Sequence, residues 1–274
     1  MSTTTLTPSS TTSSDARRTG RISPAAGLRH GFTITWRNLM RIKRSPESLL
    51  DLTLQPIIFI VLFVYLFGGA ISGNQHAYLQ FLLPGILVQT VVFASAGTGV
   101  GLADDITKGI FDRFRTLPIA RWAPLFGAIV ADIIRYVVTV VVVLGFGMIL
   151  GYRPAGGPAG VLAASVLVLG FAFALCWIIA LVALYVKKPQ QVQGFVFPVM
   201  FPLTFGSNAF VHTSTLPSWL QTWVHINPVT HVINATRDLM SGINPGADLL
   251  YSLIWMVGIV VVFAPLAVAK YRRT

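Results

Sequence analysis

Two oppositely charged residues, Asp132 and Arg135, lie inside a long apolar stretch of the sequence. If this stretch crosses a membrane, both charges are costly there and mark a candidate functional site. A helix would place them on one face, because they are three residues apart, and they could then neutralise each other. Two interpretations stay open. The pair either faces a central cavity, where it contacts a transported compound or couples helix movements, or it lies near the membrane interface with Arg135 reaching a neighbouring helix.

The motifs that bind nucleotides or metals are absent from the sequence. No Gly-Lys-Ser/Thr run is available to cradle phosphates, and the glycines between 97 and 101 lie in an apolar run that no strand precedes. His225 and His231 are six residues apart, which does not place them on one helix face, and Cys176 is the single cysteine. We therefore expect no catalytic residue, no metal site and no cofactor bound by this chain itself.

The composition is that of an integral membrane protein. Of 274 residues, 54% are hydrophobic and only 11% are charged, and the mean hydropathy is +0.72. A soluble domain has about a quarter of its residues charged. The net charge of +11 does not indicate nucleic-acid binding, because the basic residues lie at the ends of apolar runs rather than on a water-facing surface.

The apolar runs predict an all-α, polytopic fold with six transmembrane helices. Six crossings place both termini on one side of the membrane. Seventeen Lys or Arg then lie on that side, against Arg153 and Arg237 on the other, so both termini are predicted to be cytoplasmic. The expected spans are 49–71, 78–103, 124–150, 159–186, 193–211 and 249–269.

The N-terminal region precedes these spans and has two parts. Residues 1–26 are rich in Ser and Thr and are expected to form a disordered cytoplasmic tail, and 27–274 form the transmembrane domain. Within that domain, residues 28–44 have the pattern of a basic amphipathic helix, which we expect to lie on the membrane surface. The alternative is a solvated helix on a soluble domain.

The segment 212–248 is too polar to span a membrane, yet it carries Trp219 and Trp223, whose side chains favour the membrane interface. We expect one or two short helices that dip into the outer leaflet and form an extracellular cap, with a turn at Asn227-Pro228. The alternative is an irregular external loop. The uncharged polar residues within the apolar spans need partners there and are our candidates for a substrate path, together with Asp132 and Arg135. They are Gln55, Gln89 and Asn208.

The loop after the second span is amphipathic and charged, and it ends at Pro118. A short helix that exposes Ile110, Phe111 and Phe114 beside charged residues is what docking to a soluble partner requires, because apolar anchors are buried and charges fix the register. The alternative is an ordinary basic loop.

At this loop the sequence resembles the permease subunits of type-2 ABC exporters, in the daunorubicin-resistance-like branch. The resemblance covers about residue 28 to the end and rests on several short motifs. These are Lys108-Gly109-Ile110-x-Asp112-Arg113-Phe114-Arg115-x-Leu117-Pro118, Pro84-Gly85, Gln193-Gly194, Pro202 with Phe210-Val211, Leu216-Pro217-x-Trp219-Leu220, Asn227-Pro228, and Arg237 with Gly242.

The resemblance implies a plasma-membrane permease without its own ATPase site. Two copies of a cytoplasmic ABC ATPase would bind ATP and Mg and contact the segment 108–118, including Phe111. The permease would pair with a second copy or a related permease within membrane lipids, and its cargo would be amphipathic drugs, antibiotics or lipids. Rival hypotheses are a proton-coupled secondary carrier that titrates Asp132, a structural or sensor membrane protein, and an intramembrane enzyme.

Overall fold

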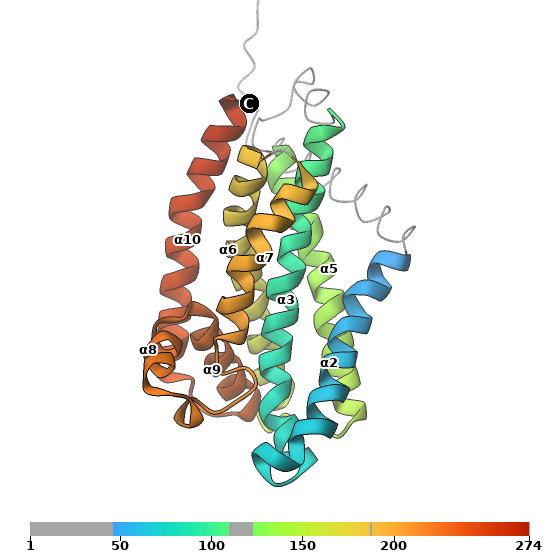
Figure 1. The fold of residues 1–274 in the computed structure, drawn as a ribbon, viewed down its shortest axis with the longest axis vertical. Coiled ribbons are helices and arrows are strands. Elements are labelled where there is room, and N and C mark those ends of the chain that lie inside the picture. The colour runs from blue at the N-terminus through green and yellow to red at the C-terminus, as the bar shows by residue number, and fades with distance from the viewer. Residues whose placement is uncertain (1–45, 110–122, 187, 274) are drawn as a thin grey trace, which may run out of the picture.

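The computed structural model describes residues 46–109, 123–186 and 188–273, and these residues form a bundle of helices with no strand among them (Figure 1). The predicted tail and the amphipathic helix at 28–44 lie outside the described residues. The helices are α2 (Pro46–Ser72), α3 (Gln75–Thr107), α5 (Ala123–Ile149), α6 (Gly157–Val186), α7 (Pro189–Phe205), the 3-10 turn η1 (Thr213–Thr215), α8 (Ser218–Ile226), α9 (Pro228–Ser241) and α10 (Gly246–Arg273).

Within the described residues, five helices are long and apolar enough to cross a membrane, namely α2, α3, α5, α6 and α10. The all-helical prediction is confirmed for the described residues. Each of these five helices covers one expected span, and no expected span extends more than one residue beyond its helix. Helix α3 lies at the centre of the bundle, where it packs against α2, α5, α6, α7 and α9 (Figure 1). Its long run of small and apolar residues allows this, because every face of the helix must pack against a neighbour.

Helix α7 is shorter than the fifth predicted span, and the predicted boundary at residue 211 is wrong. The helix ends at Phe205, and its 17 residues extend for only about 25 Å, less than the roughly 30 Å of a hydrocarbon core. Pro198 and Pro202 each remove a backbone donor from it. After Gly206 the chain leaves the helix. The Ser207 amide bonds to the Thr204 carbonyl at 3.3 Å, three residues back, and the Asn208 side chain donates to Asn234 of the segment that follows.

The residues after α7 form two short helices at one end of the bundle, where α8 and α9 pack against each other (Figure 1). Asn227 begins α9 by accepting a hydrogen bond from the Val229 amide at 2.9 Å, and Pro228 occupies the first helical position. Gly242 ends α9 in the left-handed conformation, with φ of 72°, which glycine adopts without strain. The predicted turn at Asn227-Pro228 is therefore the junction of two helices.

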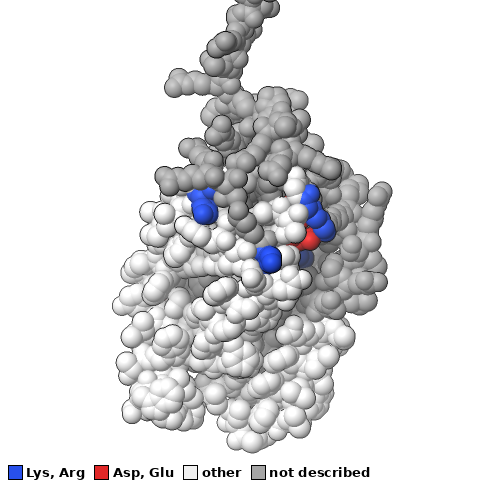
Figure 2. All heavy atoms as spheres, turned by 45° about the horizontal axis from the view of Figure 1, so that its top comes forward, with Lys and Arg blue, Asp and Glu red and all other residues white. Residues whose placement is uncertain are grey.

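The two ends of the bundle differ in charge. We call the end where α3 and α10 finish and α5 begins the basic end; it carries Lys108, Lys188 and Lys270. Figure 2 shows Lys and Arg side chains at separate places on this end, one of them beside an acidic group. The opposite end, which we call the cap end, holds α8 and α9.

Candidate functional site

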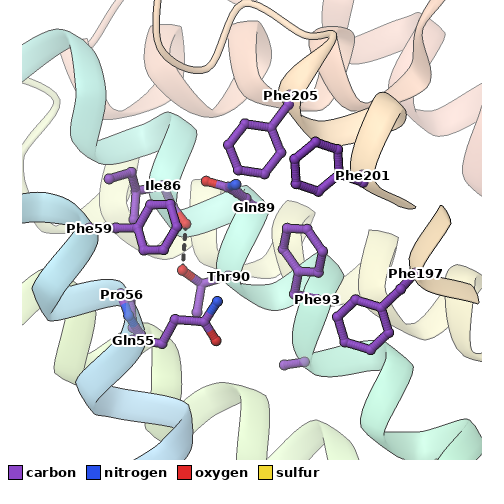
Figure 3. A pocket seen from close by; sticks show the side chains of 11 residues that line it. Gln55, Pro56, Phe59, Ile86, Gln89, Thr90, Phe93, Phe197, Phe201 and Phe205 are labelled. Atoms are coloured by element: carbon purple, nitrogen blue, oxygen red, sulfur yellow. Dashed lines mark hydrogen bonds between the residues drawn. The ribbon is translucent and has the colours of Figure 1, made fainter. Parts of the chain in front are cut away.

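A cavity of about 330 Å³ lies between α2, α3 and α7, and it is the candidate functional site of the described residues. Its walls are mainly aromatic and aliphatic, and its polar groups are two carboxamides and one hydroxyl (Figure 3). Such a volume and such a lining are typical of small-molecule pockets. The lining residues are Gln55, Pro56, Phe59, Ile86, Gln89, Thr90, Phe93, Ala94, Phe197, Phe201 and Phe205.

The position of the polar groups follows from the period of α3. Ile86, Gln89, Thr90 and Phe93 recur at spacings of three and four, so that one face of α3 forms a wall of the cavity. Thr90 donates its hydroxyl hydrogen bond to the Ile86 carbonyl at 2.7 Å and is thereby satisfied within its own helix. Gln89 is only 5% exposed, and its side chain lies at the cavity.

The aromatic wall comes mostly from α7. Phe197, Phe201 and Phe205 recur every four residues and so lie along one face of that helix. Two pairs of rings stack at the cavity. Phe197 stacks on Phe93 of α3 with centroids 5.9 Å apart, and Phe201 stacks on Phe205 with centroids 4.3 Å apart. Beyond the cavity, Phe205 stacks on Phe210 at 5.2 Å, so aromatic contact continues toward the cap end.

Two of the predicted substrate-path residues, Gln55 and Gln89, line this cavity from different helices. The other three do not line it. Asn208 donates to the Asn234 side chain at 2.6 Å in the segment after α7, and Asp132 and Arg135 lie on α5, which contributes no cavity-lining residue. The roles of all five residues stay predictions.

Asp132 and Arg135 form the ion pair that their spacing allows, with 3.2 Å between Oδ1 and Nη2, and each side chain is 18% exposed. The Arg135 Nη2 also donates to the Ala94 carbonyl of α3 at 3.4 Å. Beside the pair, Tyr136 contacts the Thr98 hydroxyl and the Cys176 thiol, the latter at 3.5 Å. These groups join α3, α5 and α6, so Arg135 contacts a neighbouring helix. Among the described residues, no Asp, Glu, His, Lys or Arg lines the cavity.

Arg237 is half-buried at the cap end and is held chiefly by uncharged groups. Its guanidinium donates to the carbonyls of Phe81 and Asn208, each at 3.3 Å, and lies 4.0 Å from the centroid of the Phe81 ring. Burial lowers the pKa of Arg237 to about 10, although the carboxylate of Asp238 opposes this shift. The side chain stays protonated at neutral pH and ties α9 to α3 and to the segment after α7.

The other cap residues that the sequence singled out have different surroundings. Asn227 donates from its amide to the Leu203 carbonyl at 2.7 Å, so it joins α7 to the start of α9 besides capping α9. Trp219 is 72% exposed on α8, on the same helix face as Trp223 and Ile226. Pro228 begins α9.

Only the start of the predicted coupling segment lies within the described residues. Lys108 forms an ion pair with Asp104 at 2.6 Å, and Gly109 has a φ of 65°, which ends the helix. The remaining members lie outside the described residues. They are Ile110, Phe111, Asp112, Arg113, Phe114, Arg115, Leu117 and Pro118.

The sequence analysis missed the aromatic residues of the cavity and the hydroxyl of Tyr136. The phenylalanines of α7 are four residues apart, and this spacing could have indicated that they share a helix face at a cavity. In an apolar run, however, the same spacing is equally typical of a helix face that contacts lipid. Tyr136 carried no signal, because its partners Thr98 and Cys176 are distant in the sequence.

Comparisons with known proteins agree on one family. Residues 29–241 match the model of the ABC-2 type transporter. The chain is 42% identical over 252 residues to the daunorubicin resistance ABC transporter permease protein DrrB1 of Streptomyces coeruleorubidus, covering 91% of this chain and 89% of that protein. It is also 31% identical over 243 residues to the probable doxorubicin resistance ABC transporter permease protein DrrC of Mycobacterium tuberculosis, with 87% of both chains covered. A putative transport permease, ycf38 of Cyanophora paradoxa, is 30% identical over 220 residues, which are 77% of this chain and 73% of that one.

Proposed function

Because this chain belongs to the ABC-2 type transporter family, we propose that it is the permease subunit of an ATP-driven exporter in the plasma membrane, which moves amphipathic drugs, antibiotics or lipids outward. The observation that carries this proposal is the cavity between α2, α3 and α7, whose lining is apolar apart from uncharged polar groups. A pocket of this kind accepts compounds with large apolar surfaces and gives little to a sugar or an inorganic ion.

We further propose six transmembrane crossings with both termini in the cytoplasm. Helix α7 would be the fifth crossing, since it begins at the basic end beside the last residues of α6 and leads toward the cap end. The basic end would face the cytoplasm because of its excess of Lys and Arg. The helices α8 and α9 would then form the extracellular cap, with Trp219 and Trp223 in the outer leaflet.

The energy must come from another subunit, because the sequence has no phosphate-binding loop. A cytoplasmic ABC ATPase, in two copies that bind ATP and Mg, would contact the segment from Lys108 to Pro118 at the basic end. This segment directly follows α3, and α3 forms one wall of the cavity, so a push on it would reach the cargo site through a single helix. Two permease copies, identical or related, would complete the exporter within the lipid bilayer.

The test is to purify the chain after co-expression with the ATPase encoded next to it, and to measure drug- or lipid-stimulated ATP hydrolysis. We expect a stable complex whose hydrolysis depends on this chain. Replacing Phe114 with Asp should abolish co-purification and stimulation, because a charge would occupy an apolar contact, while membrane insertion persists. Thr116→Asp adds the same charge at a polar position of the same loop and should preserve the complex. Unchanged stimulation by the Phe114 variant would remove the coupling assignment.

The second candidate function is a proton-coupled carrier, and the buried carboxylate of Asp132 is the observation in its favour. It predicts transport that needs a proton gradient and no ATPase, and that Asp132→Asn abolishes. Transport that persists after the ATPase subunit is deleted would replace the exporter proposal by this one.

A further inference from the structure

We propose that Gln89 determines which compounds the cavity accepts, by selecting flat, fused-ring molecules that carry a hydrogen-bond donor directly beside an acceptor, as a lactam or an imide does. This inference rests on the proposed function only in taking the cavity as the cargo site. It adds the chemistry by which cargo is recognised and the residue that recognises it.

The first observation is that the Gln89 carboxamide has no hydrogen-bond partner among the described residues, although the residue is only 5% exposed. The nitrogen and oxygen of this amide are not among the fully enclosed side-chain atoms, because the side chain opens onto the cavity. Another glutamine of α3 has its partners within the protein. Gln80, nine residues earlier on α3, donates to the Gly151 carbonyl at 3.1 Å and accepts from the Arg153 amide at 3.2 Å. The Gln89 amide is therefore available to a molecule in the cavity.

The second observation is where this amide lies. Figure 3 places it among the rings of Phe59, Phe93 and Phe205, in the space between α2, α3 and α7. A ligand that enters this space meets aromatic surface on several sides. Of the two carboxamides at the cavity, only that of Gln89 is buried, since Gln55 is exposed. Aromatic surfaces do not distinguish well between compounds of similar area, so the selectivity must come from the polar group.

The arrangement of the rings favours a flat molecule. The Phe93–Phe197 pair has an interplanar angle of 29°, and the Phe201–Phe205 pair has one of 23°. Each pair therefore presents nearly parallel rings, against which another planar system can stack in an offset manner. A bulky aliphatic molecule would leave part of this aromatic surface without contact.

The carboxamide itself defines the polar edge of the ligand. It offers N–H donors and a carbonyl acceptor side by side in one plane. The complementary edge has an acceptor beside a donor, so that two hydrogen bonds form at once. The cavity has no Lys, Arg, Asp or Glu among its lining residues, so the part of the ligand that enters is expected to be uncharged.

The experiment compares two probes of nearly equal shape, 6(5H)-phenanthridinone, which has a lactam edge, and phenanthrene, which has none. Binding of each tritiated probe to the purified full-length chain in detergent is measured on beads, with empty beads as background. Two neutral hydrogen bonds predict that the native chain prefers phenanthridinone by about tenfold or more in Kd. N-methylphenanthridinone, which keeps the carbonyl and loses the donor, should bind with intermediate affinity.

Gln89→Met keeps the length of the side chain and removes the amide, so the preference should fall to about one, mainly through weaker phenanthridinone binding. Gln190→Met makes the same change at an exposed position of α7 outside the cavity and should keep the native preference. A native chain that binds both probes equally, binds neither, or keeps its preference in the Gln89 variant overturns the inference. If the Gln89 variant does not fold, the probes on the native chain still overturn the inference when they show no preference for phenanthridinone. Since no ATPase is present, the result is independent of whether the exporter proposal holds.

Discussion

Gly160 of α6 lies directly against the backbone of α9, and replacing it with alanine should loosen the cap end from the bundle. A methyl group on Gly160 would lie 2.2 Å from the Leu239 carbonyl oxygen, whereas ordinary contacts begin at 3.4 Å. The obstacle is backbone rather than a flexible side chain, so α9 as a whole must move by about 1 Å.

The magnitude follows from three contributions. Overpacking of this kind costs about 1–3 kcal/mol, and a shift of α9 would also weaken the hydrogen bond from the Gly156 amide to the Met240 carbonyl, now 2.8 Å, for about 1 kcal/mol more. Alanine improves helix propensity by up to about 1 kcal/mol, which offsets part of this cost. A net loss of about 1–3 kcal/mol should lower the Tm by roughly 3–8 °C.

The assay is thermal unfolding of the purified chain in detergent, followed by fluorescence-detected size exclusion. Gly101→Ala is the matched control, because a methyl group there meets nothing within 4 Å, and helix propensity alone should leave its Tm unchanged or slightly higher. Equal Tm values for the two variants would refute the argument that α9 is held by backbone contact at Gly160.

Three further predictions concern the cap end. Asn227→Ala should destabilise the chain by about 2–4 kcal/mol in thermal unfolding. Asn227→Ser keeps a cap acceptor on α9 and loses the bonds to the Leu203 and Gly206 carbonyls, so it should cost less; equal losses would contradict the dual role. Arg237→Met should reduce export and stability together. Arg237→Lys should restore only part of both, since an ammonium cannot reproduce the two bonds to carbonyls and the stacking on Phe81. Full rescue by lysine would argue against this geometry. Burial raises the pKa of Asp238, so ionisation of this carboxyl opposes folding as the pH rises. The Tm of Asp238→Asn, relative to that of the native chain, should therefore increase from pH 4 to pH 7. A Tm difference that is independent of pH would refute this prediction.

Local patterns determined which parts of this chain become helices. Long apolar runs bounded by turn residues predicted five of the observed helices nearly to their ends, because a membrane-spanning segment must satisfy its backbone hydrogen bonds internally. The boundary of α7 was predicted six residues too late. The apolar run continues through Phe210 and Val211, but Asn208 bonds to Asn234 of α9, a partner that no local pattern encodes.

Close helix contacts also depended on the tertiary structure. Glycines at 97 and 101 have the spacing of a helix contact, yet a methyl group on Gly101 would meet open space, while the tightest approach to another backbone is at Gly156 and Gly160. A spacing of four residues indicates only that two glycines lie on the same face of a helix. Whether a neighbouring helix lies on that face depends on the whole bundle.

The candidate site divides in the same way. The sequence by itself determined that Gln55 and Gln89 lie in apolar runs, and that Asp132 and Arg135 can pair on one helix face. Only the tertiary structure decided that the two glutamines meet at one cavity, that Asn208 bonds to Asn234 instead, and that the phenylalanines of α7 form the opposite wall. The physical reason is that an apolar helix face contacts lipid and other helices equally well, so composition cannot tell which neighbour it will have.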